Sequence, residues 1–158
     1  LTFMLWGGVF ERFPRLKAMV VEGGTMFMVP SWLMLLDHNY TDIQFSAKLG
    51  DFRSHLSMAP SEYFARNCGI GASCVPRRDL DMRDQIGLKQ IMWGSDFPHP
   101  EGTWPNTAQY YQDTFKGFDA DDGRQILGGN AIEFYGLDRQ YLDGLAAEIG
   151  PSSSIFTG

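Results

Sequence analysis

Short apolar runs of strand character alternate with segments of helical period along the chain. The strand-like runs are Lys17–Val21, Cys68–Ser73 and Lys89–Trp93. The helical segments are Trp32–His38, Met58–Asn67, Arg77–Gly87, Thr107–Lys116, Ala120–Leu127 and Asp138–Ile149. This alternation is typical of an α/β fold, in which crossover helices join the strands of a parallel sheet. Three strands cannot close a barrel, so we expect an open sheet edge at the first strand.

Capping signals predict where several helices begin or end. We expect Leu1–Phe13 to be helical up to Pro14, whose ring stops a helix. Ser31 is placed to cap the second helix. Asn130, with Glu133 three residues on, has the spacing of a capping box that opens a short helix.

The remaining segments carry weaker patterns. Residues 41–57 show little periodicity and predict a partly ordered loop. Residues 151–158 predict a frayed end. We therefore expect one domain over residues 1–150, followed by a flexible tail over residues 151–158.

The most informative stretch of the sequence is Ile91–Pro105. An apolar strand ends there in small residues, and Asp96, His99 and Glu101 follow within six positions, between prolines that restrict the loop. The carboxyl end of a strand is where open α/β sheets and α/β barrels place their chemistry. Glu22 repeats the arrangement after the first strand, since two glycines follow it.

The motif Trp93–His99, continued by Glu101–Pro105, resembles the last-strand motif of the amidohydrolase-related family, the metal-dependent TIM-barrel hydrolases and decarboxylases. Three further stretches fit the order of motifs in that family, namely Gly8–Lys17, Val21–Gly24 and Gly129–Ala131. The resemblance extends from about residue 7 to residue 138 and covers the carboxyl-terminal motifs of the family. It implies part of a TIM (β/α)8 barrel, consisting of the last strands and their helices.

The length of the chain bears on this fold. A chain of 158 residues suffices for one domain, whereas a TIM barrel typically needs about 250 residues. We therefore expect the chain to be incomplete on its own, with its barrel completed by an amino-terminal half or by another subunit. The alternative is a compact α/β domain that uses similar local motifs.

The resemblance assigns chemistry first to Asp96. In the family, the Asp that ends the last strand ligates a divalent metal ion and can accept a proton from metal-bound water, roles that suit a hard, anionic side chain. Asp96 could instead cap a turn through the loop amides. His99 could orient Asp96, contact substrate or ligate metal, or it could be a structural hydrogen-bonding residue. We take both as candidate catalytic residues, with Asp96 as the metal ligand.

Glu22 stands where many members of the family carry a His that polarises the substrate carbonyl or the attacking water. An ionised carboxylate accepts hydrogen bonds but cannot donate them. Glu22 is therefore a third catalytic candidate, as a ligand, a base or an acceptor for a substrate hydroxyl. The alternative is a buried acid bonded to the amides of Gly23 and Gly24. Glu101 is a candidate for substrate binding, or it pairs with a nearby amide or cation.

Two tryptophans follow strand-end loops and are candidates for the wall of an apolar pocket that binds substrate. Core packing is the alternative for Trp32. Trp104 lies within the motif loop, which favours the pocket.

The metal site of the family also uses a His-x-His pair and a further His. Neither occurs here, because His38, His55 and His99 have no such spacing. Metal affinity depends on ligand number and preorganisation. We therefore expect a divalent metal ion, Zn²⁺ or Mn²⁺, to be weakly held or absent in this chain alone.

Composition excludes some partners. Thirteen basic and nineteen acidic residues give a net charge of −6, which argues against nucleic acid and anionic membranes. No uninterrupted apolar run reaches the roughly 18 residues of a membrane span. Cys68 and Cys74 flank a strand about 20 Å long, too far apart for a disulfide. We expect free thiols and a reducing, cytoplasmic compartment.

The function implied by the resemblance is metal-dependent hydrolysis of a C–N or C–O bond, or nonoxidative decarboxylation of an aromatic or unsaturated carboxylic acid. The substrate would be a small molecule, and we also expect a homo-oligomer. The alternative belongs to another class, a catalytically silent scaffold that associates through the open sheet edge.

Overall fold

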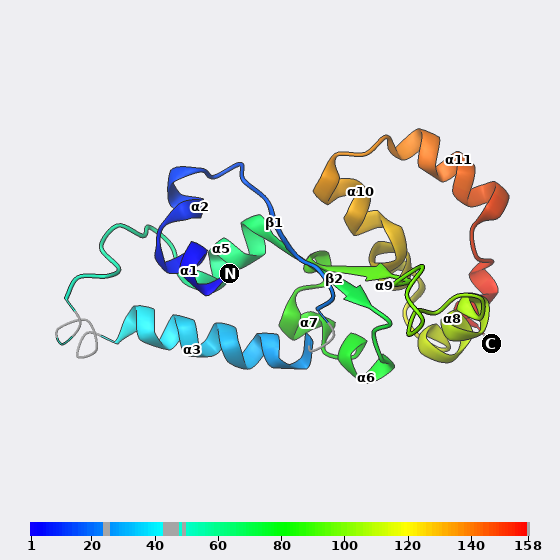
Figure 1. Ribbon diagram of the computed structural model, residues 1–158, viewed down its shortest axis with the longest axis horizontal. Coiled ribbons are helices and arrows are strands. Elements are labelled where there is room, and N and C mark those ends of the chain that lie inside the picture. The colour runs from blue at the N-terminus through cyan, green and yellow to red at the C-terminus, as the bar shows by residue number, and fades with distance from the viewer. Residues whose placement is uncertain (24–25, 43–47, 49, 158) are drawn as a thin grey trace.

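The computed structural model describes residues 1–23, 26–42, 48 and 50–157. The chain is a mixed α/β structure built around three parallel strands (Figure 1). Strands β1 (Ala18–Val20), β2 (Cys68–Ser73) and β3 (Ile91–Gly94) lie side by side in that order. Ile70 of β2 pairs with Val20 on one side and Ile91 on the other. The predicted parallel sheet is therefore confirmed.

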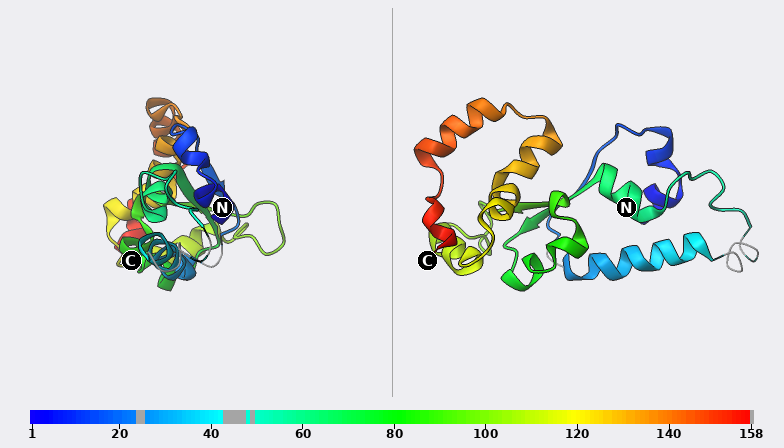
Figure 2. Two further views of the ribbon diagram at one scale, coloured as in Figure 1. Left: turned by 90° about the vertical axis from the view of Figure 1, so that its left-hand side faces the viewer. Right: turned by 180° about the vertical axis from the view of Figure 1, so that it is seen from behind.

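The helices fall into three groups along the chain, before β2, between β2 and β3, and after β3. Before β2 lie α1 (Thr2–Trp6), α2 (Val9–Arg12), the turn η1 (Met26–Met28), α3 (Val29–Thr41) and α5 (Pro60–Asn67). Between β2 and β3 lie α6 (Arg77–Leu80), α7 (Arg83–Ile86) and the turn η2 (Leu88–Gln90). After β3 lie α8 (Thr107–Phe115), α9 (Ala120–Arg124), the π-helical turn η3 (Gln125–Gly129), α10 (Asn130–Tyr135), α11 (Arg139–Ile149) and the turn η4 (Ser153–Phe156). Figures 1 and 2 show α1 to α5 at one end of the molecule and α8 to α11 at the other.

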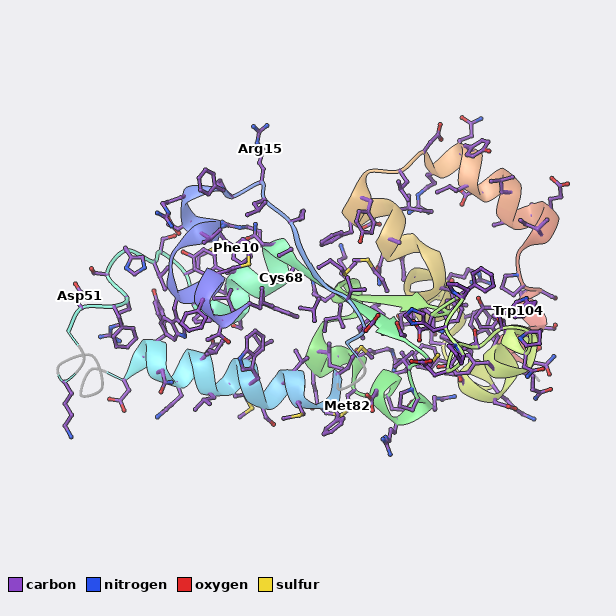
Figure 3. All side chains as sticks on the ribbon, in the orientation of Figure 1. Phe10, Arg15, Asp51, Cys68, Met82 and Trp104 are labelled. Atoms are coloured by element: carbon purple, nitrogen blue, oxygen red, sulfur yellow. The ribbon has the colours of Figure 1, made fainter. Side chains whose placement is uncertain are left out.

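One face of the sheet packs against helices. Ile70, Ala72 and Ile91 on this face are at most 3% exposed and belong to the main hydrophobic core. Successive side chains of a strand point to opposite faces, so apolar residues at alternate positions of β2 gather on one side. Phe64 of α5 and Phe10 of α2 join the same core. Figure 3 shows Phe10 directed inward, toward α5.

The opposite face of the sheet carries small residues near the strand ends. Gly71 pairs with Met92, and Ser73 pairs with Gly94. This keeps the carboxyl end of β2 and β3 free of bulky side chains on that face. Further back, a Cβ atom on Gly69 would lie 2.8 Å from the methyl group of Met92, so that part of the face is filled.

Two predicted helices are interrupted, and one begins earlier than expected. The segment expected to be helical up to Pro14 breaks after α1, because Gly8 has a φ of 65°. The segment 77–87 forms two short helices, α6 and α7. Ser31 does not cap α3, which begins at Val29 with Pro30 in its first turn, where no N–H is needed.

The predicted loop over residues 41–57 begins one residue late. Thr41 still belongs to α3, which is longer than expected. Residues 43–47 and 49 lie outside the described residues.

Asn130 does not cap a helix. The chain passes from α9 through η3 to α10 with helical backbone at every junction, so Gly128 and Gly129 do not end a helix. The side-chain amide of the buried Asn130 instead donates to the carbonyls of Leu88 and Ile91, both at 2.7 Å. Asn130 thereby ties the last helices to the start of β3.

The predicted frayed tail is wrong for residues 153–156. Ile155 and Phe156 of η4 are buried, and the Phe156 ring packs edge-on against Phe115 with 6.2 Å between centroids. The amide of Gly117 donates to the Phe156 carbonyl at 2.9 Å. The serine-rich segment before this turn favours disorder. Burial of the Phe156 ring offsets the backbone entropy that is lost when the turn becomes ordered.

The sequence predicts that both cysteines are free thiols. Cys68 and Cys74 are free thiols, as predicted. Burial raises the pKa of Cys68 to about 12. Among the described residues, each helix is too short or too polar to cross a membrane.

Candidate functional site

Each strand of the sheet is followed by a residue with left-handed backbone. Glu22 follows β1 with a φ of 57°, Cys74 follows β2 with 49° and Asp96 follows β3 with 59°. Among the described residues these are the only non-glycine residues with positive φ. This conformation costs a non-glycine residue about 1–2 kcal/mol, and such strain gathers at functional sites. Because the strands are parallel, all three residues lie at the end of the sheet where the strands terminate, which we call its carboxyl edge.

The candidate site is a cluster of two carboxylates and one imidazole at this edge. Ligand atoms of Glu22, Asp96 and His99 lie within 4.8 Å of one another. Glu22 and Asp96 come from strands that are separated by β2, so the contact spans the width of the sheet. The structure thus brings together the three residues that the sequence singled out as catalytic candidates.

Asp96 and His99 form the closest pair within the cluster. Nδ1 of His99 lies 3.1 Å from Oδ1 of Asp96, and the amide of His99 donates to the Asp96 carbonyl at 2.9 Å. The Asp96 side chain is 14% exposed and that of His99 is 56% exposed. A half-exposed imidazole therefore holds a largely buried carboxylate in one orientation, which fits one of the roles expected for His99.

Backbone hydrogen bonds close the loop that carries this pair. The amide of Thr103 donates to the Ser95 carbonyl at 2.9 Å, and the amide of Gly102 donates to the His99 carbonyl at 3.0 Å. A Cβ atom on Gly102 would lie 2.8 Å from the carbonyl oxygen of Asp96, so only glycine fits there. The loop is compact at its base and fixes the position of Asp96.

The far part of the loop projects from the body of the protein (Figure 2, left). Trp104, labelled in Figure 3, is 66% exposed and Phe97 is 64% exposed. Their rings pack edge-on with 5.8 Å between centroids. Trp104 thus belongs to an exposed aromatic pair with Phe97, a residue of the Trp93–His99 motif that was not among the candidate site residues.

Trp32 is half-buried and packs against the hydrophobic core. Its indole N–H donates to Oγ1 of Thr2 at 3.2 Å, and its ring contacts Phe64 edge-on. It lines an apolar cavity of about 220 Å³ together with Val20 and Gly23, on the helix-covered side of β1. Neither the exposed Glu101 nor Trp104 lines this cavity.

Cys74, which the sequence indicates only as a free thiol, also lies at this edge of the sheet. Its thiol donates to the carbonyl of Glu101 at 3.7 Å. Burial raises the pKa of Cys74, and the negative charges of Asp96 and Glu101 raise it further, so the side chain is a neutral thiol at pH 7. Its position directly after a strand is the signal that would have found it.

Glu22 differs from its expected alternative, a buried acid bonded to the following amides. The side chain is exposed, and the amide of Gly23 donates to the carbonyl of Gly71 at 2.9 Å rather than to Glu22. Gly24 lies outside the described residues. Within the part of the chain that the structure describes, the Glu22 carboxylate has no hydrogen bond or ion pair.

The donor set of the cluster fits a divalent metal ion. Two carboxylates and one imidazole suit Mn²⁺ or Zn²⁺, and three ligands leave further coordination positions for substrate and for other residues. The other histidines lie elsewhere: His38 of α3 pairs with Asp42 at 3.8 Å, and Nε2 of His55 lies 2.9 Å from the Trp6 carbonyl. They do not contribute to this edge of the sheet.

A parallel α/β sheet with acids at its strand ends is the architecture of many metal-dependent enzymes. A model of the amidohydrolase family matches residues 2–137. Since this match covers well over half of the sequence, the chain belongs to the amidohydrolase family.

Three known proteins illustrate the similarity. The chain is 29% identical over 136 residues to 2-amino-3-carboxymuconate-6-semialdehyde decarboxylase of Dictyostelium discoideum, covering 85% of the chain and 35% of that protein. The structure of 5-carboxyvanillate decarboxylase from Sphingomonas paucimobilis matches with a TM-score of 0.66 and 28% identity, over 85% of this chain and 38% of that one. Dihydroxybenzoic acid decarboxylase from Polaromonas sp. JS666, solved with manganese and the inhibitor 2-nitroresorcinol, shares the fold with a TM-score of 0.61 and 21% identity, at the same coverage of 85% and 38%. The chain spans little more than a third of the length of these relatives.

Proposed function

We propose that this chain is the carboxyl-terminal part of an amidohydrolase-type (β/α)8 barrel that catalyses metal-dependent, nonoxidative decarboxylation of an aromatic or unsaturated carboxylic acid. The observation that carries the proposal is the convergence of Glu22, Asp96 and His99 within 4.8 Å at the carboxyl edge of the sheet. Barrel enzymes place their active sites at that edge.

Decarboxylation is favoured over hydrolysis by the relatives of the chain. The Dictyostelium discoideum protein and the Sphingomonas paucimobilis structure both carry the names of decarboxylases. The acids in those names, a carboxymuconate semialdehyde and carboxyvanillate, carry the carboxyl group on an unsaturated or aromatic carbon. A substrate of the same class is the proposal for this chain.

Asp96 and His99 have complementary tasks in such a reaction. Asp96 is the largely buried anionic ligand, and the 3.1 Å contact with His99 Nδ1 keeps its carboxylate oriented. A divalent cation, when bound, stabilises the negative charge that develops on the substrate as carbon dioxide leaves. The substrate carbon must then accept a proton, and the Asp96–His99 pair is the candidate donor at this edge of the sheet. Phe97 and Trp104 present an aromatic surface beside this pair for a planar substrate.

Residues outside this chain complete the proposed site. Because the chain spans 35% of one relative and 38% of another, we propose that the remaining strands and ligands come from an amino-terminal half or another subunit. We propose Mn²⁺ or Zn²⁺ as the ion and a homo-oligomer as the assembly.

The alternative function is a catalytically silent scaffold that associates through the open side of β1, the outer strand of the sheet. The exposure of Val20 and Val21 at β1, 38% and 70%, favours an apolar partner at this edge. A completed barrel would cover the same edge, so exposure alone does not decide between the two.

The test is release of carbon dioxide by protein purified from its native source, so that any residues that complete the site are present. The substrates are 5-carboxyvanillate and 2-amino-3-carboxymuconate 6-semialdehyde, followed by a panel of ortho-hydroxybenzoates. We expect metal-dependent turnover that falls about 10³-fold in Asp96→Asn, because a lost ligand removes several kcal/mol of transition-state stabilisation. The matched control is Asp143→Asn on the exposed α11. Metal-free protein without turnover on the whole panel would instead support the scaffold.

A further inference from the structure

We propose that Glu22 is itself a direct ligand of the divalent cation, so that one ion joins the ends of β1 and β3 through three side chains of this chain. The inference rests on the proposed function, which supplies the cation. It adds a ligand from the first strand and predicts that the chain binds the ion without the rest of a barrel.

The geometry of the cluster permits a shared ion. Two oxygen or nitrogen atoms bound to one ion at about 2.1 Å lie roughly 3–4 Å apart. The donor atoms of Glu22, Asp96 and His99 lie within 4.8 Å of one another, and Glu22 is exposed. These separations are close to those that one shared ion requires.

The charges of the cluster favour a cation at its centre. An ionised carboxylate is only an acceptor, so ionised Glu22 and Asp96 side chains cannot bond to each other and repel one another. His99 contacts Asp96, whereas Glu22 has no ion pair or hydrogen bond with any residue that the structure describes. A divalent ion placed between the three groups converts the repulsion into attraction.

The backbone holds Glu22 at this position. The amide of Gly23 donates to the carbonyl of Gly71 at 2.9 Å, which fixes the turn after β1 against β2. Glu22 itself adopts a φ of 57°, close to the 59° of Asp96. The two carboxylates are therefore presented from similar backbone geometry on either side of β2.

The test is isothermal titration of the full chain with MnCl₂ after removal of metal by EDTA. We expect the dissociation constant of Mn²⁺ to rise about 10²-fold in Glu22→Gln, and binding to be lost in Asp96→Asn. The matched control for Glu22→Gln is Glu148→Gln, an exposed residue of α11 that leaves the affinity unchanged. As a second readout, Mn²⁺ should raise the Tm of the parent chain more than that of Glu22→Gln.

The outcomes separate this inference from the proposed function. Parent-like Mn²⁺ affinity in Glu22→Gln, with binding lost in Asp96→Asn, overturns the role of Glu22 and leaves the decarboxylase proposal in place. Parent-like affinity in Asp96→Asn contradicts the proposed function. A parent chain that binds no Mn²⁺ overturns the inference that three ligands of this chain suffice. Circular dichroism checks the fold of each variant, and Glu22→Asn, which tolerates left-handed backbone, replaces Glu22→Gln if that variant does not fold.

Discussion

Glu22 and Asp96 share the same left-handed backbone conformation, with φ angles of 57° and 59°, at the ends of two strands that are not neighbours in the sheet. Their side chains converge with His99 within 4.8 Å. Left-handed backbone is unfavourable in free energy for a non-glycine residue. Two such residues with converging side chains therefore indicate a functional site, where the placement of the side chains outweighs the local loss of stability.

Gly102→Ala should weaken cation binding by distorting the loop that carries Asp96. A Cβ atom there would lie 2.8 Å, 2.9 Å and 3.0 Å from the carbonyl oxygens of Asp96, Ser95 and His99, and backbone atoms cannot move aside cheaply. We expect Mn²⁺ affinity to fall about 10- to 100-fold, as is typical when the support of a ligand is lost. Gly144→Ala is the control, because nothing lies within 4 Å of its Cβ position. Equal Mn²⁺ affinities for the two variants in a calorimetric titration would show that the loop is not strained by a side chain at 102.

Asn130→Ala should destabilise the fold by about 2–3 kcal/mol. The variant removes both donors to the carbonyls of Leu88 and Ile91, and buried acceptors left without partners cost about 1–3 kcal/mol. Urea unfolding measures the difference. Asn130→Asp should be no better than alanine, since a carboxylate cannot donate; a parent-like free energy of unfolding for Asn130→Asp would exclude this explanation.

Phe156→Ala should cost about 3 kcal/mol of stability, although the residue lies near the end of the chain. The ring is 7% exposed and packs against Phe115, and truncation of a buried phenylalanine leaves a cavity. Ser153→Ala in the same turn is exposed and serves as the control. If Phe156→Ala changes the free energy of unfolding by less than about 0.5 kcal/mol, the range typical of surface substitutions, the tail is frayed and this explanation is wrong.

The buried thiol of Cys68 predicts a loss of stability in alkaline solution. Below a pH of about 8.5 the thiol is neutral in both the folded and the unfolded chain. As the pH rises further, the unfolded thiol ionises while the folded one, with its pKa of about 12, does not, so ionisation draws the chain toward the unfolded state. Between pH 8 and pH 10 the parent should therefore lose about 2 kcal/mol more than Cys68→Ala. The same decline in both proteins during urea unfolding would contradict this assignment.

The sheet was predictable because its strands carry local signals. Ile70 and Ile91 sit in short apolar runs bounded by glycine or charged residues, and those runs define β2 and β3 without reference to the rest of the fold. Asp96 and Glu22 were found by the same reasoning, since Glu22 follows such a run directly and Asp96 follows one after small residues. Their convergence then required only that parallel strands end at a common edge.

Side-chain partners far apart in sequence were not predictable. Asn130 has the local pattern of a helix cap, but its amide reaches carbonyls about forty residues earlier, at Leu88 and Ile91. Phe156 follows a serine-rich segment typical of a frayed end, yet its burial depends on Phe115. In each case the stabilising contact is tertiary, and a local pattern carries no information about it.

The most direct test of the account is the position of a cation relative to Asp96. Crystals of the chain grown or soaked with MnCl₂ would be measured at the manganese absorption edge, where anomalous scattering locates the ion. The account predicts one peak at about 2.1–2.2 Å from a carboxylate oxygen of Asp96. A carboxylate turned toward solvent, with the manganese peak elsewhere or missing at saturating MnCl₂, would contradict it.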